Sequence, residues 1–269
     1  MDTSFVAKKK FGQHFLHDKS IINKIVAHSC LNENDKILEI GPGKGSLTKI
    51  LVKSKANIIA LEIDNDLING PLKIFDDYPN VKIIESDANN LSPEITNLLG
   101  NSYKLISNLP YNSGTHILTS LLTSPYPPKT SVIMLQKEVA NNICGRDNKL
   151  GFLGAFFQSF ATTKNLFTVR PTSFRPPPKV MSSVIKIELL DNPLINLEQL
   201  ESYKSFLYAG FSAPRKQLHN SLSNGLDITM SYSKTLLSMA EINPTIRPEK
   251  LSVNEWVSLF RKFIETQKS

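Results

Sequence analysis

Short apolar runs alternate with helical patterns through the first half of the chain, and this alternation constrains the fold more than any other feature. Strands separated by helical segments form βαβ units, whose strands lie parallel in one sheet. A run such as 36–40, which ends at a glycine-rich turn before a helical pattern at 46–52, is typical of such a unit. The sequence predicts seven strands, at residues 36–40, 57–62, 81–85, 103–107, 131–135, 165–170 and 183–189.

The two late strands are expected to bring antiparallel pairing into the sheet. Seven strands with that mixture favour an α/β fold with a mostly parallel, Rossmann-like sheet of the methyltransferase type over a six-stranded dehydrogenase sheet. The segment 191–193 (Asp-Asn-Pro) breaks the pattern, and apolar residues beyond it, such as Leu200 and Tyr203, follow helical spacing. We therefore predict an α/β domain at 1–190 and a small, all-helical domain at 191–269.

Charge and composition restrict the partners. The net charge is +7, and a basic surplus favours polyanions such as RNA. Residues 1–190 hold 22 Lys and Arg against 16 Asp and Glu, so phosphate contacts are expected mainly there. No apolar run approaches the roughly 20 residues of a membrane helix, and the basic N-terminus lacks the apolar stretch of a secretory signal. We expect a cytoplasmic protein that makes no membrane contact.

Cysteine and histidine indicate no metal site. Cys30 and Cys144 form no CxxC pair, and no His/Cys cluster has zinc spacing. A Ser-His-Asp set and a catalytic carboxylate pair are not evident either. The five histidines are scattered, at His14, His17, His28, His116 and His219.

A glycine-rich turn at 41–45 (Gly-Pro-Gly-Lys-Gly) follows the first long strand and opens a helical pattern. Glycine lets the backbone approach a ligand closely. Taken alone, the turn could equally be part of a dinucleotide fingerprint. Pro42 between the glycines, and Ser46 where GxGxxG needs its third glycine, disfavour a tight pyrophosphate site.

Acidic residues end the next two strands. Glu62 can accept hydrogen bonds from both ribose hydroxyls of an adenosine. Asp87 can accept a bond from an adenine amine, although an Asp at this position also suits a turn or a helix cap. The order of glycine turn, Glu62 and Asp87 predicts an adenosine-containing cofactor.

The residues 108–111 (Asn-Leu-Pro-Tyr) directly follow the fourth strand and suit methyl transfer to an aromatic amine. The amine of adenine is a poor nucleophile because its lone pair is delocalised into the ring. The Asn108 carboxamide oxygen and the Leu109 carbonyl can accept from the NH₂ and free that lone pair. Tyr111 offers a face on which the base can stack, and the base must be unpaired or flipped to reach it.

Together these segments resemble the ribosomal RNA adenine dimethyltransferase family, and most closely the branch that acts on small-subunit RNA. The resemblance covers nearly the whole chain, and several motifs in order are far more specific than any one of them. They are residues 9–18, 39–48, 62–64, 87–88, 108–111, 135–140, 174–180 and 182–184 and, in the helical domain, Phe211, 215–218 and Asn220.

The resemblance implies that residues 1–190 form the S-adenosylmethionine-dependent methyltransferase domain and that the helical domain at 191–269 binds RNA or the subunit. It also implies S-adenosyl-L-methionine as the cofactor and Asn108, Leu109 and Tyr111 as the catalytic residues around the target adenine. The family position of His14 is often Asn. Phe174 matches a position that could supply a second stacking face or belong to the core. The implied cofactor contacts are His14, Leu16, Gly41, Glu62, Asp87 and Asn108.

The resemblance also implies a substrate, namely two adjacent adenosines near the 3′ end of small-subunit (16S) ribosomal RNA, each dimethylated late in subunit assembly. The partner would be the immature 30S subunit, bound by a monomer. Basic residues are expected to grip RNA phosphates. These are Lys8, Lys9 and Lys10, Arg170, Arg175 and Lys179 around the proline-rich loop, and Arg215 and Lys216 in the helical domain.

Three other functions remain open at this stage. One is a large-subunit RNA methyltransferase of the macrolide-resistance type, and another is a DNA adenine methyltransferase. The third is a catalytically silent ribosome assembly factor that keeps the fold. Phe-Gly-Gln at 11–13, Asn-Leu-Pro-Tyr at 108–111 and the Arg-Lys motif at 215–216 favour the small-subunit branch. The chain has no recognisable target-recognition insertion, which disfavours a DNA methyltransferase. Intact Glu62, Asp87, Asn108 and Tyr111 argue against a silent protein.

Overall fold

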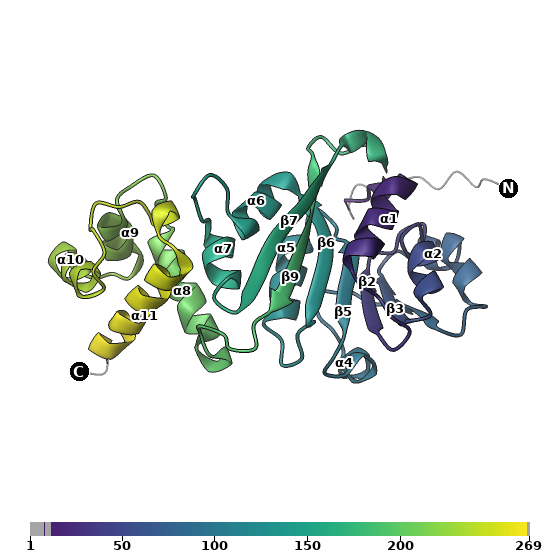
Figure 1. Cartoon of the computed structure of the whole chain (residues 1–269), viewed down its shortest axis with the longest axis horizontal. Helices are drawn as coiled ribbons and strands as arrows, with labels where there is room; N and C mark the ends of the chain where they lie inside the picture. The colour runs from purple at the N-terminus through teal and green to yellow at the C-terminus, as the bar shows by residue number, and fades with distance from the viewer. Residues whose placement is uncertain (1–7, 9–11, 268–269) are drawn as a thin grey trace. The chain divides into compact units, whose positions relative to one another are not determined.

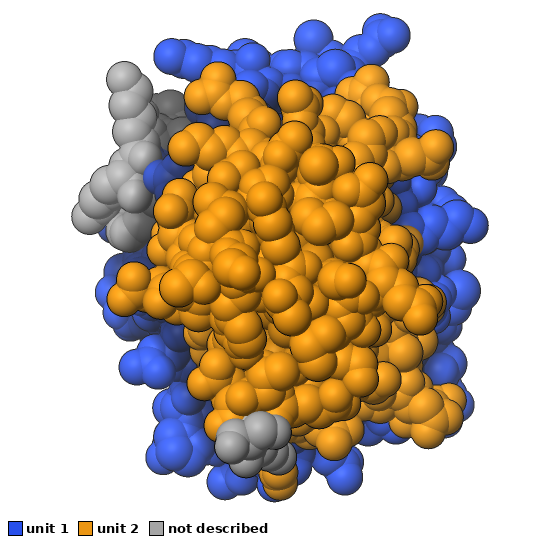
Figure 2. Space-filling model, turned by 90° about the vertical axis from the view of Figure 1, so that its left-hand side faces the viewer, with its two compact units in different colours: residues 1–140, 164–188 blue, residues 141–163, 189–269 orange. Residues whose placement is uncertain are grey.

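The computed structural model describes residue 8 and residues 12–267. Two compact units divide the chain, and Figure 2 colours them separately. Unit 1 comprises residues 1–140 and 164–188, and unit 2 comprises residues 141–163 and 189–269. Within the described residues, no helix is long and apolar enough to span a bilayer.

A seven-stranded sheet organises unit 1, with the strand order β4-β3-β2-β5-β6-β9-β7 (Figure 1). The first five of these strands pair in parallel, and β9 pairs antiparallel with β6. The mostly parallel sheet and its late antiparallel pairing are therefore as predicted. The strands are β2 (Lys36–Ile40), β3 (Asn57–Glu62), β4 (Val81–Glu85), β5 (Lys104–Asn108), β6 (Thr130–Gln136), β7 (Ala161–Val169) and β9 (Ser182–Leu189).

The central strands β3, β2, β5 and β6 are largely buried because they carry apolar runs, whereas β4 and most of β7 are partly exposed. Ile37 and Leu38 of β2 are fully buried, and they lie in the middle of the strand order. The helical pattern predicted at 46–52 becomes a short helix, α2 (Thr48–Leu51), followed by a 3-10 turn. The other helices that connect the strands are α1 (Lys19–His28), α3 (Asn65–Ile68), α4 (Pro93–Leu99), α5 (Gly114–Leu122) and α6 (Lys137–Cys144).

The strand order reverses between β2 and β5. The chain proceeds from β2 to β3 and β4 on one side, and continues through β5 and β6 on the other. At such a switch point the loops beyond the carboxyl ends of the strands part and leave room for a ligand. The topology thus places the candidate site at the carboxyl ends of β2, β3, β4 and β5.

A second, two-stranded sheet was not predicted. β1 (Phe15–Leu16) pairs antiparallel with β8 (Phe174–Arg175), and the His17 amide donates to the Ser173 carbonyl at 3.1 Å. This pairing ties the N-terminal segment to the proline-rich loop. Strands of two residues carry too little hydrophobic pattern to be recognised in a sequence.

Unit 2 is helical and packs around aromatic side chains. Trp256 and Tyr203 are fully buried, and the rings of Phe206 and Phe260 lie 5.5 Å apart. Glycine at 210 is required because a Cβ there would lie 2.4 Å from the Trp256 ring. Its helices are α7 (Phe152–Phe157), α8 (Leu200–Gly210), α9 (Leu218–Gly225), α10 (Met230–Met239) and α11 (Val253–Gln267).

Residues 141–163 join this unit, whereas the sequence-based division assigns them to the first domain. The Leu150 amide donates to the Glu249 carbonyl at 2.8 Å, and the Tyr203 hydroxyl donates to the Ala155 carbonyl at 3.3 Å. Phe156 and Phe157 of α7 are fully buried. The contacts that recruit this segment join residues far apart in sequence, and a division read from chain order cannot register them.

Candidate active site

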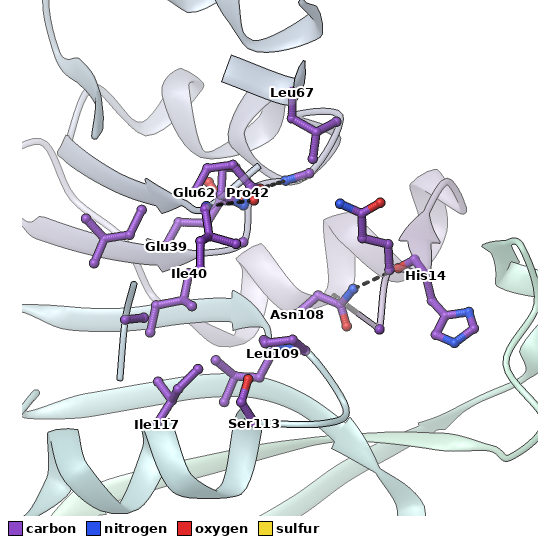
Figure 3. A pocket seen from close by; sticks show the side chains of 18 of the residues that line it. His14, Glu39, Ile40, Pro42, Glu62, Leu67, Asn108, Leu109, Ser113 and Ile117 are labelled. Atoms are coloured by element: carbon purple, nitrogen blue, oxygen red, sulfur yellow. Dashed lines mark hydrogen bonds between the residues drawn. The ribbon is translucent and has the colours of Figure 1, made fainter. Parts of the chain in front are cut away.

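A cavity of about 290 Å³ opens in unit 1 at the carboxyl ends of β2, β3, β4 and β5. The glycine turn after β2 and the N-terminal residues 12–16 complete its wall. Figure 3 shows Glu39 and Glu62 on one side and Asn108 and Leu109 on another. All eight residues predicted for cofactor or catalysis line this cavity, namely His14, Leu16, Gly41, Glu62, Asp87, Asn108, Leu109 and Tyr111.

Two glycines of the turn, Gly41 and Gly43, differ in the space that a side chain would find there. Gly41 has φ +62°, and a Cβ there would meet nothing within 4 Å. Its amide donates to the Leu61 carbonyl at 2.8 Å, which holds the turn against β3. At Gly43, with φ +60°, a Cβ would lie 2.9 Å from the Phe15 ring. Both positions need glycine for their backbone dihedrals, and Gly41 in addition leaves the backbone accessible to a ligand.

Glu62 is a buried carboxylate held by main-chain donors. Its Oε2 accepts from the Gly43 amide at 3.2 Å, and its Oε1 accepts from the Ile63 and Asp64 amides at 2.9 and 3.0 Å. Burial raises the pKa of this carboxyl, and the three amides oppose that rise. A carboxylate has about four acceptor positions. One edge of Glu62 can therefore still accept hydrogen bonds from a ligand.

Glu39 lies near the end of β2, just before the glycine turn, and the sequence predicts no individual role for it. It is 2% exposed, and the Thr48 hydroxyl donates to its Oε2 at 2.8 Å. Burial raises the pKa of Glu39 to about 8, the Thr48 hydroxyl opposes the rise, and neighbouring Glu62 adds to it. This carboxyl therefore holds its proton at neutral pH.

Asp87 is exposed in the loop after β4. Its Oδ1 accepts from the Asn89 amide at 2.9 Å and from the Asn89 side chain at 2.7 Å. These bonds fix the carboxylate at the rim of the cavity. The turn role considered from the sequence is thus present, and it is compatible with a ligand contact.

Asn108, the last residue of β5, has a buried side-chain oxygen that accepts no hydrogen bond from the described residues. Its Nδ2 donates to the His14 carbonyl at 3.3 Å, as drawn in Figure 3. Among the described residues, no group donates to its buried Oδ1. An unpaired buried acceptor costs free energy, so this oxygen is poised for a donor that arrives with a ligand.

Leu109 and Tyr111 follow in the same loop. Leu109 is 1% exposed, and its amide donates to the Met134 carbonyl at 3.2 Å, which holds the loop beside β6. Tyr111 is half-buried, and its hydroxyl bonds to the hydroxyl of Ser182. Burial raises the pKa of the Tyr111 phenol, so it stays protonated.

The N-terminal segment is fixed across the cavity by contacts that the sequence did not predict. Gln13 donates to Asp64 Oδ2 at 2.8 Å, and Lys8 pairs with Asp64 at 2.6 Å. Burial alone would raise the pKa of Asp64, but hydrogen bonds from Lys8 and Gln13 outweigh it, so the pKa is lowered. Lys8 thus has carboxylate partners, while Lys9 and Lys10 lie outside the described residues.

His14 presents different groups to the two sides of the segment. Its carbonyl accepts from Asn108, whereas its Nδ1 donates to the Pro176 carbonyl at 2.8 Å. The imidazole lies 5.3 Å from the ring of Tyr111 and points away from Glu39 and Glu62 (Figure 3). A cofactor contact by His14 would therefore come from its main chain rather than from the ring.

A sequence profile of the family described as ribosomal RNA adenine dimethylase matches residues 4–265. The chain belongs to this family. Similar proteins include the ribosomal RNA small subunit methyltransferase A of Dehalococcoides mccartyi strain BAV1, 36% identical over 94% of this chain and 87% of that one. The protein of the same name from Clostridium botulinum strain ATCC 19397 is 36% identical over 95% and 93%.

Solved structures agree with the fold. A dimethyladenosine transferase from Plasmodium falciparum superposes with a TM-score of 0.77 at 23% identity, over 94% of this chain and 98% of that one. The 23S rRNA methyltransferase ErmE superposes with a TM-score of 0.73 at 22% identity, over 92% and 98%. The prediction of a Rossmann-like methyltransferase sheet with a C-terminal helical region is confirmed.

None of the predicted RNA-contacting residues within the described part of the chain lines the cavity. Phe174 is 2% exposed, belongs to the main hydrophobic core of unit 1, and pairs with Leu16 in the small sheet. Of the two interpretations of Phe174, stacking face or core residue, the structure therefore supports the core residue. Lys179 is exposed on the proline-rich loop of unit 1, and Arg215 and Lys216 are exposed in unit 2, between α8 and α9.

Proposed function

We propose that this protein transfers methyl groups from S-adenosyl-L-methionine to the N6 amines of two adjacent adenosines near the 3′ end of small-subunit ribosomal RNA. The products are N6,N6-dimethyladenosines made during ribosome biogenesis. The membership in the dimethylase family and the names of the curated relatives support the reaction and the substrate. The observation that carries the chemistry is the buried Oδ1 of Asn108, which accepts no hydrogen bond from any described residue.

The cavity suits the proposed cofactor. Gly41 leaves room for close approach, Glu62 keeps an acceptor position for a ribose hydroxyl, and Asp87 presents a carboxylate for the adenine amine. His14 and Leu16 would cover the cofactor from the N-terminal segment. When bound, the cofactor supplies an electrophilic methyl group on a positively charged sulfur.

The target amine would lie at the end of β5. In the first transfer, Asn108 Oδ1 and the Leu109 carbonyl would accept from its two N–H groups, which draws the nitrogen toward tetrahedral geometry and makes its lone pair available. In the second transfer, the monomethylated amine has one N–H left for these acceptors. In each transfer the nitrogen would gain the methyl group as the methyl–sulfur bond breaks, and the amine would lose one proton to solvent. Tyr111 stacks on the base and orients it. Holding nitrogen, methyl carbon and sulfur in line supplies much of the acceleration, because orientation alone can lower a barrier by several kcal/mol.

The proposal includes the immature 30S subunit as partner, a monomeric enzyme and a cytoplasmic location. Exposed Lys179, Arg215 and Lys216 would bind RNA phosphates. These contacts would position the subunit, while the cavity selects an unpaired adenine.

Large-subunit RNA is the second candidate substrate, because the fold also resembles that of ErmE. Tritium transfer from labelled cofactor distinguishes the two. We expect label in immature small subunits, with dimethyladenosine at two adjacent adenines near the 3′ end. Label in naked large-subunit RNA instead would overturn the substrate assignment, and no label in either would indicate a silent assembly factor.

A further inference from the structure

Tyr111 is held at two points by residues outside its own loop. Its hydroxyl bonds to Ser182, the first residue of β9, which lies 71 residues away in sequence. Ser182 is fully buried and sits opposite Gln136 in the antiparallel pairing of β9 with β6. The partner of the phenol is thus anchored in the main sheet rather than in a loop.

The imidazole of His14 packs against the Tyr111 ring, with ring centroids 5.3 Å apart and planes tilted by 35°. At this separation the two rings are already in contact, and no base fits between them. His14 is itself held through the bond from its Nδ1 to Pro176. The ring of Tyr111 is therefore supported on its His14 side, and a base can stack only on its other face.

A tyrosine on a loop can turn about two side-chain bonds unless its ends are held. Loss of the Ser182 hydroxyl would leave the half-buried phenol without this partner, and such a group tends to turn toward water. A base that stacks on a mobile ring is poorly aligned for an in-line reaction.

We propose that Ser182 is a positioning residue for methyl transfer, which fixes the Tyr111 ring in the plane on which the target adenine stacks. This inference rests on the proposed function of the cavity. Ser182 acts through the Tyr111 hydroxyl and touches neither the cofactor nor the base.

The neighbouring Ser183 is a matched control. Both serines are fully buried in β9, and successive strand residues point to opposite faces of the sheet. Ser183 pairs with Leu135 in the register, and none of the described residues hydrogen-bonds to its hydroxyl. Replacing either serine by alanine removes one oxygen from the same strand.

The test is a double-mutant cycle on single-turnover methylation of small-subunit RNA, at saturating cofactor, with Ser182→Ala, Tyr111→Phe and both together. We expect Ser182→Ala and Tyr111→Phe each to slow transfer by about tenfold. The double variant should be within about twofold of either single variant, because each substitution removes the same bond. Cofactor affinity should stay unchanged, and Ser183→Ala should retain the wild-type rate.

Equal rates for Ser182→Ala and Ser183→Ala would overturn the inference while leaving the proposed function intact. So would a Ser182→Ala loss that persists in full in the Tyr111→Phe background, because the serine would then act by another route. Absence of transfer by the wild-type protein would overturn the proposed function and the inference with it.

Discussion

The carboxyl ends of β3 and β5 face one cavity, but the polar side chains at the two ends differ in their hydrogen bonding. At the end of β3, both carboxylate oxygens of Glu62 already accept main-chain hydrogen bonds. At the end of β5, Asn108 Oδ1 is buried and accepts none from the described residues. A satisfied charge gives a rigid docking point for a cofactor, whereas an unsatisfied neutral acceptor gains most when the reacting group arrives. We propose on this basis that the end of β3 binds the cofactor and that the end of β5 performs the chemistry.

The largest effect should come from Asn108→Ala. The variant loses the acceptor for the target amine, so methyl transfer should fall on the order of 10²- to 10³-fold, while cofactor binding stays measurable. Single-turnover rates and calorimetry together measure both. Asn101→Ala, an exposed site just before β5, is the control. A wild-type rate for Asn108→Ala would rule out the mechanism.

Glu62→Ala should mainly weaken cofactor binding. The carboxylate would accept from a ribose hydroxyl, and loss of this charge-assisted hydrogen bond should cost roughly 1.5–3 kcal/mol of binding free energy. Glu85→Ala is the matched control, since Glu85 lies opposite Glu62 in the register but is exposed and does not line the cavity. Calorimetry that finds the same affinity for Glu62→Ala and wild type would remove Glu62 from the cofactor site.

Glu39→Gln tests whether the buried carboxyl group of Glu39 is protonated at neutral pH. The pKa of Glu39 is raised from 4.5 to about 8 in the folded protein. Its stabilising contribution is therefore fully present below about pH 4.5 and is lost as the pH rises to about 8. We expect the free energy of unfolding of the wild type to fall relative to Glu39→Gln across this interval. Denaturant titrations that give parallel pH profiles would contradict it.

The smallest effect should be on the salt dependence of subunit binding. This measurement tests phosphate contacts, which contribute to affinity but do not select the base. Each phosphate contact contributes about 0.7–0.9 to the slope of log affinity against log salt. Replacing Arg215 and Lys216 by alanine should therefore lower the slope for subunit binding by between about 1 and 2 units, with cofactor affinity unchanged. A Lys234→Ala, Lys250→Ala double variant is the charge-matched control from exposed sites in the same unit. Equal slopes for wild type and the Arg215 and Lys216 variant would exclude phosphate contacts by this pair.

Sequence reasoning predicted the seven strands because apolar runs with short turns are local signals, and all seven are present. It also selected eight residues that line the cavity, since they stand where strands end or within recognisable motifs. Gln13, Asp64 and Ser182 also lie within the motifs of the family resemblance, but the sequence predicted no individual role for them. Their roles depend on partners 51 and 71 residues away.

The amino-acid sequence by itself determined the kinds of element, their order and the family of the protein. Each of these depends on the period of apolar residues or on short motifs, which are properties of neighbouring residues. The tertiary structure decided that Phe174 lies in the core, that residues 141–163 pack with the C-terminal helices, and that Asn108 keeps an unpaired oxygen. Burial and hydrogen-bond partners arise only when distant segments pack together, so no local pattern can specify them.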